Sequence, residues 1–264
     1  MNEYGTHLVP LLRRMNKLEQ FTLHIYIGGG EKLIDGNDIH QDILIHMAQL
    51  QSFVFHIQSS CKPNILSENF TNKDIEQTFI NIGYEQVICM TRSDIDIFML
   101  CNVFSVPYAF DFVHMFGKNF DKMIFPNVTR LHLWESTPFD YEFFFRLAQS
   151  FPVLRTLLIH NWDHDRDRDR LKDDLPSNSF VEFPCLSILD VTGAHFIYIE
   201  QLLHYSTTRL PQLTKLKIQY EDLKMVTNNF TRDATRINCS KIQILNFFET
   251  IEHSDEFARY FPSL

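Results

Sequence analysis

The sequence predicts an α/β fold built from stacked repeats, and two observations carry this prediction. The first is a nine-residue phrase, apolar-Pro-x-Leu-x-x-Leu-x-aliphatic, which occurs at 125–133, 151–159, 183–191 and 210–218. The second is its spacing: from position 128 onwards, the first leucine-like residues lie 26 to 32 residues apart. Repeats of about 20–29 residues are typical of leucine-rich repeats. We therefore expect an irregular leucine-rich-repeat solenoid, with parallel strands on the concave face and helices on the convex face.

Each repeat is expected to contain a helix followed by a short strand. The Leu-x-x-Leu-x-Leu half alternates apolar and variable residues, as a strand does. The preceding segment has apolar residues at i, i+3, i+4 and i+7, the spacing of one helix face. Two copies show this spacing: Leu8, Leu11, Leu12 and Met15, and Phe144, Leu147, Ala148 and Phe151. Asp38 and Ser254 are expected helix starts, and the proline of each phrase ends its helix because it lacks an N–H group.

The chain is expected to form a single repeat array over 1–264, of about seven to nine units. Two repeats fall in 1–60 and better-marked ones in 123–264, whereas 61–122 holds poorly marked repeats with a hairpin insertion. In that insertion a helix over 72–82 precedes strands at 85–90 and 96–104, with a turn at Arg92–Asp94. Alternating charges at 163–178 predict a solvated loop. An ordinary α/β domain whose strands share a local phrase is the alternative.

Composition excludes several classes of partner and compartment. The formal net charge is −9 and no Lys/Arg cluster is present, which argues against nucleic acid and anionic membranes. The five cysteines are widely spaced and form no C-x-x-C pair, as expected of free thiols in a reducing compartment. The N-terminus does not have the layout of a signal peptide, and no run approaches transmembrane length. These features predict a soluble protein of the cytoplasm or nucleus.

Catalytic interpretations are weak. The segment His160-Asn-Trp-Asp-His164-Asp165 has metal-ligand residue types, but the charge run beyond it favours a solvated loop over a rigid site. Gly28–Gly30 follows an apolar strand phrase but lacks the spacing of a phosphate-binding loop, so a flexible turn is expected. No familiar catalytic motif is present. We expect no catalytic residue, no metal and no cofactor.

The variable positions of the strands are the expected contact surface for a partner. Because the leucines point into the core, the residues between them should share the opposite face and form columns across neighbouring strands, about 4.8 Å apart. One column should hold His24, His56, Trp134 and His160. The candidate partner-binding residues are His24, His56, Arg130, His132, Trp134, Leu158, His160, Asp190, Lys215, Lys217 and Phe248. Aromatic side chains dominate binding hot spots. The alternative is that neighbouring loops half-cover these Trp and His side chains, which then only fill space.

Three stretches give the chain a family resemblance: the Phe-Pro-x-Leu-x-x-Leu units, the segment 105–110 and above all 220–239, Tyr-Glu-Asp-Leu-Lys-Met-Val-Thr-Asn-Asn-Phe-Thr-Arg-Asp-Ala-Thr-Arg-Ile-Asn-Cys. Together they resemble the C-terminal repeat region of the F-box/leucine-rich-repeat protein family. The resemblance implies the substrate receptor of a Skp–cullin–F-box ubiquitin ligase. No F-box is found within this chain, so an adaptor is an expected partner only if an F-box lies outside it. The chain is then expected to be a fragment or a repeat protein without the ligase link.

The function expected from the sequence is a non-enzymatic protein-recognition module. By resemblance it is the substrate-binding repeat region of an F-box protein. A stand-alone leucine-rich-repeat scaffold or adaptor without a ubiquitin link is the first alternative. A small α/β hydrolase or metal enzyme is the second.

Overall fold

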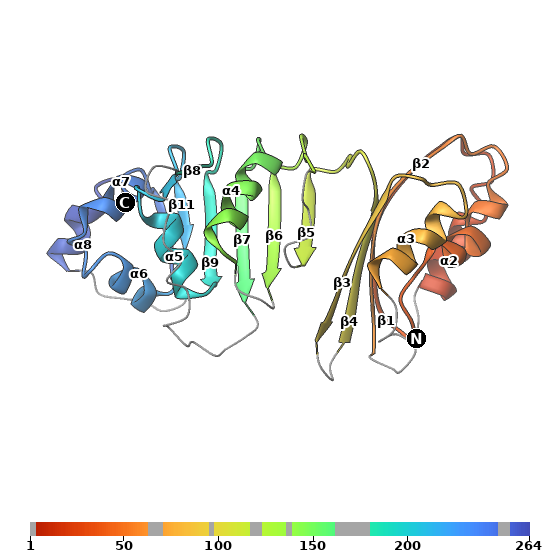
Figure 1. Cartoon of the computed structure of the whole chain (residues 1–264), viewed down its shortest axis with the longest axis horizontal. Helices are drawn as coiled ribbons and strands as arrows, with labels where there is room; N and C mark the ends of the chain where they lie inside the picture. The colour runs from red at the N-terminus through yellow and green to blue at the C-terminus, as the bar shows by residue number, and fades with distance from the viewer. Residues whose placement is uncertain are drawn as a thin grey trace. The chain divides into compact units, whose positions relative to one another are not determined.

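The computed structural model describes residues 4–62, 71–94, 98–116, 123–135, 139–161, 180–247 and 254–264. The chain forms two compact units, Met1–Ala109 and Phe110–Leu264, each with its own sheet and helices (Figure 1). The predicted mixture of helices and parallel strands is confirmed. The single repeat array stays a prediction.

The first unit contains a four-stranded sheet in the order β1-β2-β4-β3. β1 and β2 are parallel, whereas β4 is antiparallel to both of its neighbours. Its elements are η1 (Tyr4–Leu8), α1 (Val9–Leu12), β1 (Gln20–Gly30), α2 (Gly36–Asp42), η2 (Leu44–His46), β2 (Ser52–Cys61), α3 (Asn72–Ile80), β3 (Val87–Asp94) and β4 (Phe98–Ser105). Ile39, Phe55, Ile57, Phe79 and Val103 are fully buried in its core.

The helices of this unit begin where side chains satisfy their free N–H groups. The Asp35 carboxylate accepts from the Asp38 backbone N–H at 3.0 Å, and the Asp38 carboxylate accepts from the Asp35 N–H at 3.1 Å. This capping box starts α2 at Gly36, so the predicted start at Asp38 is wrong: Asp38 belongs to the first turn of the helix. The predicted helix over 72–82 is confirmed as α3, which Thr71 and Asp74 cap in the same way.

The predicted hairpin is confirmed in the antiparallel pair β3 and β4. The predicted turn at Arg92–Asp94 is wrong, because these residues continue β3 and Asp94 is still paired with Phe98. Pairing with β4 extends past the apolar residues of β3 into its polar ones, and Arg92 is itself buried. The hairpin also places an antiparallel strand, β4, next to β2.

The second unit is built around a six-stranded sheet in the order β12-β11-β9-β7-β6-β5, in which every pair of neighbours is parallel. β8 and β10 form a separate two-stranded parallel sheet. Its elements are β5 (Phe112–Phe116), β6 (Arg130–Glu135), α4 (Tyr141–Ser150), β7 (Thr156–Asn161), β8 (Val181–Glu182), β9 (Ile188–Gly193), α5 (Phe196–Leu203), β10 (Thr208–Arg209), β11 (Lys215–Lys217), α6 (Tyr220–Val226), α7 (Asp233–Cys239), β12 (Ile244–Asn246) and α8 (Asp255–Tyr260).

The repeated phrase builds the same local structure in each copy. Its first residue accepts a hydrogen bond from the N–H three residues later, closing a turn around the proline. This bond joins Phe125 to Val128, Phe151 to Leu154, Phe183 to Leu186 and Leu210 to Leu213, at 3.2 to 3.4 Å. The three phenylalanines are almost fully buried, and the rings of Phe125 and Phe151 stack with centroids 4.6 Å apart. A strand follows each turn, so the predicted order of proline and then strand is confirmed.

The expected helix comes just before Phe151-Pro152 and Phe261-Pro262. The expectation that every proline ends a helix is wrong for Pro184 and Pro211, because the short strands β8 and β10 precede them. α4 buries Phe143, Phe144 and Leu147 and ends just before Phe151-Pro152. α8 begins after Ser254, whose hydroxyl accepts from the Phe257 N–H at 3.3 Å, as predicted. The expected charged loop at 163–178 lies outside the described residues. Within the ranges that are described, no helix is long and apolar enough to cross a membrane.

Candidate functional site

The candidate site is one side of the six-stranded sheet, which we call the variable face. Its residues alternate along each strand with leucines that point the other way, into the core under the helices. Leu131, Leu157, Leu189 and Leu216 are fully buried on the core side. The variable face carries Phe112, His114, Arg130, His132, Trp134, Thr156, Leu158, His160, Ile188, Asp190, Lys215, Lys217, Ile244 and Asn246.

Strand register sorts these residues into rows that cross the sheet. One row contains Phe112, Arg130, Thr156, Ile188, Lys215 and Ile244. The next contains His114, His132, Leu158, Asp190, Lys217 and Asn246. Trp134 lies opposite His160 in a third. The predicted alignment of Trp134 with His160 is therefore confirmed. The single column of His24, His56, Trp134 and His160 is wrong, because His24 and His56 belong to the separate sheet of the first unit.

Aromatic rings fill the β5, β6 and β7 part of the variable face. The centroids of His114 and His132 lie 4.8 Å apart, and Phe112 meets His132 edge-on at the same distance. Trp134 and His160 lie 4.9 Å apart. Five rings on three adjacent strands therefore form a half-buried aromatic surface. Aromatic side chains supply much of the binding energy of protein interfaces.

Cations occupy other positions of the variable face. Lys217 forms an ion pair with the buried carboxylate of Asp190 at 3.1 Å. The Asp190 carboxylate also accepts from the Thr192 hydroxyl at 2.7 Å, so it is held in place from two strands. Arg130 forms an ion pair with Asp111 at 3.1 Å and lies over the Phe112 ring, 5.2 Å from its centroid. Lys215 on β11 lies in the same row as Arg130 on β6.

A glycine makes room for one of these rings. His160 is paired with Gly193 after a shift of register between β7 and β9. A methyl group at Gly193 would lie 2.9 Å from the imidazole of His160. The imidazole thus packs directly on the glycine backbone, which fixes its place beside Trp134.

His132 gives this face a pH-dependent stability. Burial lowers the pKa of His132 below its ordinary value, with smaller contributions from Arg130, His160 and Lys217, and Asp190 opposes the shift. The unfolded chain therefore binds a proton at His132 more readily than the folded chain does. The contribution of His132 to the free energy of unfolding is fully present above about pH 6.5 and is lost as pH falls towards the lower pKa of the folded state. Burial also lowers the pKa values of His195 and His204, which adds loss in the same direction.

We therefore expect the urea midpoint of unfolding to decrease between pH 7.5 and pH 5.5. His132→Gln should decrease less than the wild type over this range, because it removes one of the titrating groups. A midpoint that is constant or rises on acidification would contradict this expectation.

The two histidines predicted for the first unit have different environments. His24 on β1 and His56 on β2 are in register, and their rings stack with centroids 4.5 Å apart. His24 is exposed as expected. The expected exposure of His56 is wrong, because its side chain is fully buried and makes hydrogen bonds to Asn102 at 2.6 Å and Tyr108 at 2.7 Å. The reason is the hairpin: β4 pairs with β2 and places Phe104 opposite His56.

The other predicted contact residues divide into three groups. Arg130, His132, Trp134, Leu158, His160, Lys215 and Lys217 lie at least partly exposed on the variable face. Asp190 is on that face but buried beneath Lys217. Phe248 lies outside the described residues. The predicted contact residues did not include Phe112 and His114. These two alternate along β5 with the buried residues Val113 and Met115, a pattern that indicates a strand with one exposed face.

Comparison of the chain with protein-family models, curated proteins and solved structures finds no match.

The structure describes Gly28–Gly30, the weak phosphate-loop candidate, and part of the weak metal-site candidate at His160. Gly28–Gly30 do not form the expected turn, because they are the last residues of β1 and the Gly29 N–H donates to the Ser60 hydroxyl at 3.3 Å. A cavity of about 450 Å³ beside them is lined by Glu31, Asp38 and Asp42, against a single Lys32. This excess of carboxylates would repel a phosphate.

The metal-ligand interpretation centred on His160 cannot be placed, since residues 162–165 lie outside the described ranges. In the parts of the chain that are described, no group of three His, Cys, Asp or Glu side chains could hold a metal ion.

Proposed function

We propose that this chain is a non-enzymatic protein-recognition module whose variable face binds a polypeptide segment that carries carboxylates beside an apolar residue. The observation that supports this is the combination of adjacent Trp134 and His160 rings with lysines on the same face. Half-buried aromatic rings offer an apolar partner residue a large area at little cost in entropy.

Charge favours an acidic segment over a neutral or basic one. The chain has a formal net charge of −9, yet Arg130, Lys215 and Lys217 stand on the variable face. Lys217 and Arg130 already face Asp190 and Asp111, which fixes their direction and leaves Lys215 as the cation best placed for a carboxylate. A face whose charge is opposite to that of the whole chain steers acidic partners towards it.

The identity of the larger assembly rests on resemblance. The repeat phrases and the segment 220–239 resemble the substrate-binding region of F-box/leucine-rich-repeat proteins, so we include in the proposal a role as substrate receptor for a Skp–cullin–F-box ubiquitin ligase. The leucine-rich-repeat solenoid belongs to the same proposal, supported by the six parallel strands and the recurring turn. A scaffold or adaptor with the same variable face but no ligase link is the alternative.

The recognition proposal is tested with a randomised peptide library selected on the immobilised chain. Selected peptides should be enriched in Asp and Glu next to an apolar residue, and Lys215→Glu should remove the acidic enrichment. Trp134→Ala should remove the apolar preference. Lys241→Glu makes the same charge change at an exposed position outside this face and should select the same peptides as the wild type. No enrichment, or enrichment that Lys215→Glu leaves unchanged, would overturn the proposal.

The ligase link has its own experiment. Affinity purification of the full-length protein should recover a Skp-type adaptor, and recovery of bound partners without the adaptor would favour the scaffold alternative. Binding of the selected peptides by the histidine-rich face should also change between pH 5.5 and pH 7.5. A flat profile would exclude His114, His132 and His160 from the contact.

A further inference from the structure

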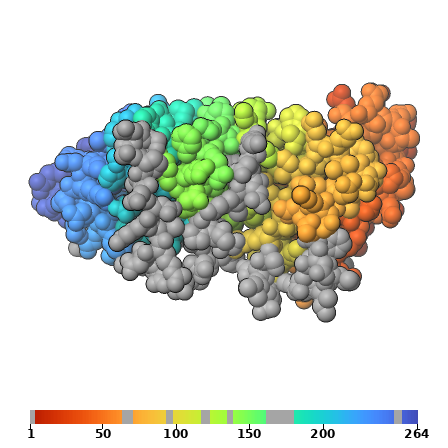
Figure 2. Space-filling model, in the orientation of Figure 1, coloured from red at the N-terminus to blue at the C-terminus, as the bar shows by residue number. Residues whose placement is uncertain are grey.

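A cavity of about 220 Å³ lies on the helix-bearing side of the second unit, on the core side of the sheet. Figure 2 shows this side, with α4 in green. The cavity lies between the start of α4, one face of α5 and the segment that leads into α7. Phe139, Tyr141 and Ile197 provide apolar walls, and Glu200, Gln201 and Arg232 provide polar groups. We call it the α5 cavity.

Helix α5 has one face buried in the core and a second face that lines the cavity. Tyr198, Ile199, Leu202 and Leu203 are buried and point into the core. Ile197, Glu200, Gln201 and His204 follow the spacing i, i+3, i+4 and i+7, so they form a second stripe, and this stripe lines the cavity. A stripe of this polarity would normally face water. Here the start of α4 and the segment before α7 stand against it.

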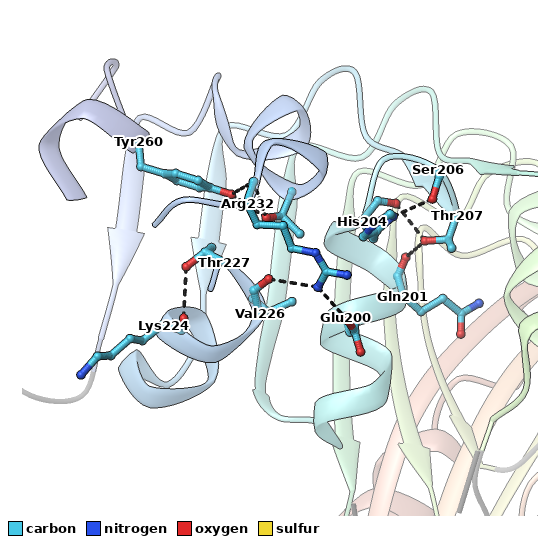
Figure 3. Close-up of polar contacts among 11 residues, drawn as sticks. Glu200, Gln201, His204, Ser206, Thr207, Lys224, Val226, Thr227, Arg232 and Tyr260 are labelled. Atoms are coloured by element: carbon cyan, nitrogen blue, oxygen red, sulfur yellow. Dashed lines mark hydrogen bonds and ion pairs between the residues drawn. The ribbon is translucent and has the colours of Figure 1, made fainter. Parts of the chain in front are cut away.

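The polar groups of the α5 cavity are held rigidly. The Arg232 guanidinium donates to the Glu200 carboxylate at 2.7 Å (Figure 3). The backbone carbonyl of Arg232 accepts from the Tyr260 hydroxyl at 2.9 Å. The Thr207 hydroxyl donates to the His204 carbonyl at 2.8 Å and ties down the end of α5. These bonds fix the cavity before any ligand arrives.

One donor of the α5 cavity has no acceptor among the described residues. The side-chain Nε2 of Gln201 is buried and makes no hydrogen bond there. Figure 3 shows the Gln201 side chain extending from α5 away from the Glu200–Arg232 pair. A buried amide N–H without an acceptor is destabilising, so a ligand that supplies an oxygen atom to Gln201 Nε2 is favoured.

Charge and size restrict the ligand. Glu200 neutralises Arg232, and Asp140 adds a further carboxylate where it caps α4 through the Phe143 N–H, so an anion is disfavoured. The lowered pKa of His204, caused by burial and then by Arg232, keeps that ring neutral as well. At about 220 Å³ the cavity is smaller than a drug-sized site and has room for about one amino-acid residue.

We infer that the α5 cavity binds a neutral ligand with an apolar group and an amide carbonyl, whose oxygen accepts the hydrogen bond from Gln201 Nε2. A single apolar residue of a polypeptide and a small free amide share this chemistry. The inference does not rest on the proposed function, because none of these residues lies on the variable face.

The experiment is a titration of the full chain with N-acetyl-leucinamide, followed by the NMR signal of the Gln201 side-chain amide. Binding should shift this signal, and N-acetyl-leucine, which carries a carboxylate, should bind about tenfold more weakly. Gln201→Leu should weaken binding of the amide about tenfold, since one hydrogen bond to a buried donor is lost. Gln149→Leu makes the same change at an exposed position of α4 and should leave affinity unchanged.

Two further measurements complete the test. Gln201→Leu should unfold at the same temperature as the wild type or a higher one, which separates loss of binding from loss of fold. Acetyl-Ala-Leu-Ala-amide distinguishes the two candidate ligands. If it binds at least as tightly as N-acetyl-leucinamide, the ligand is a residue of a polypeptide; if it does not bind, the ligand is a small free amide. Tighter binding of the carboxylate, undiminished binding by Gln201→Leu, or no binding of either amide would overturn the inference.

Discussion

His56→Ala is expected to lower the free energy of unfolding of the first unit by about 3 kcal/mol or more. The substitution removes a fully buried ring and two hydrogen bonds, at 2.6 Å to Asn102 and at 2.7 Å to Tyr108. It also removes ring contacts with Phe104 and Tyr108, at centroid distances of 5.8 Å and 5.5 Å. Urea denaturation at pH 7 measures the change.

The chain contains a matched control for this substitution. His24 has the same register position on the neighbouring strand and stacks on His56, but it is exposed. His24→Ala should therefore have a much smaller effect on stability. Equal losses for the two variants would mean that burial and hydrogen bonding do not make His56 important.

Gly36→Ala is expected to destabilise the first unit by about 2 kcal/mol. A methyl group at this position would lie 2.5 Å from the backbone carbon and oxygen of Thr78 in α3. Because backbone atoms cannot rotate away, α2 must move from α3, which stretches the 2.7 Å hydrogen bond from the Gly36 N–H to the Thr78 hydroxyl. The better helix propensity of alanine, up to about 1 kcal/mol, does not offset this loss.

The control for Gly36→Ala is Gly5→Ala, where no atom lies within 4 Å of the added methyl group. Thermal unfolding of the two variants should show a lower transition temperature for Gly36→Ala alone. A Gly36→Ala variant as stable as the wild type would show that α2 and α3 separate easily.

The sequence predicted best those features that depend on neighbours in the chain. The phrase around Pro126, Pro152, Pro184 and Pro211 closes a local turn in each copy, so the strands after it were found correctly. β5 has no such phrase and is a strand because it pairs with β6, so it was missed. The helix start at Asp38 was misplaced by one turn, because Asp35 caps the helix and Asp38 completes the box.

The candidate sites depended more on distant parts of the chain. Alternation placed His132, Trp134 and His160 correctly on one face, since each strand of the second unit keeps its own period of two. His56 follows the same alternation but is buried by Asn102 and Tyr108, which lie 46 and 52 residues away. No local pattern reports such a contact. The α5 cavity likewise combines residues from Phe139 to Arg232 and left no signal in any one segment.

The order of strands in the second unit follows the order of the chain, except that β8 and β10 lie outside the sheet. Each inner strand therefore pairs with the strand before it and the strand after it, whereas the two edge strands have one neighbour each. Opening can begin at an edge without disturbing the middle. β12 has three residues and a single neighbour, whereas β7 has six residues and lies between two strands. Amide hydrogens should accordingly exchange with solvent first at β12 and last near β7, so that this unit frays from its C-terminal end.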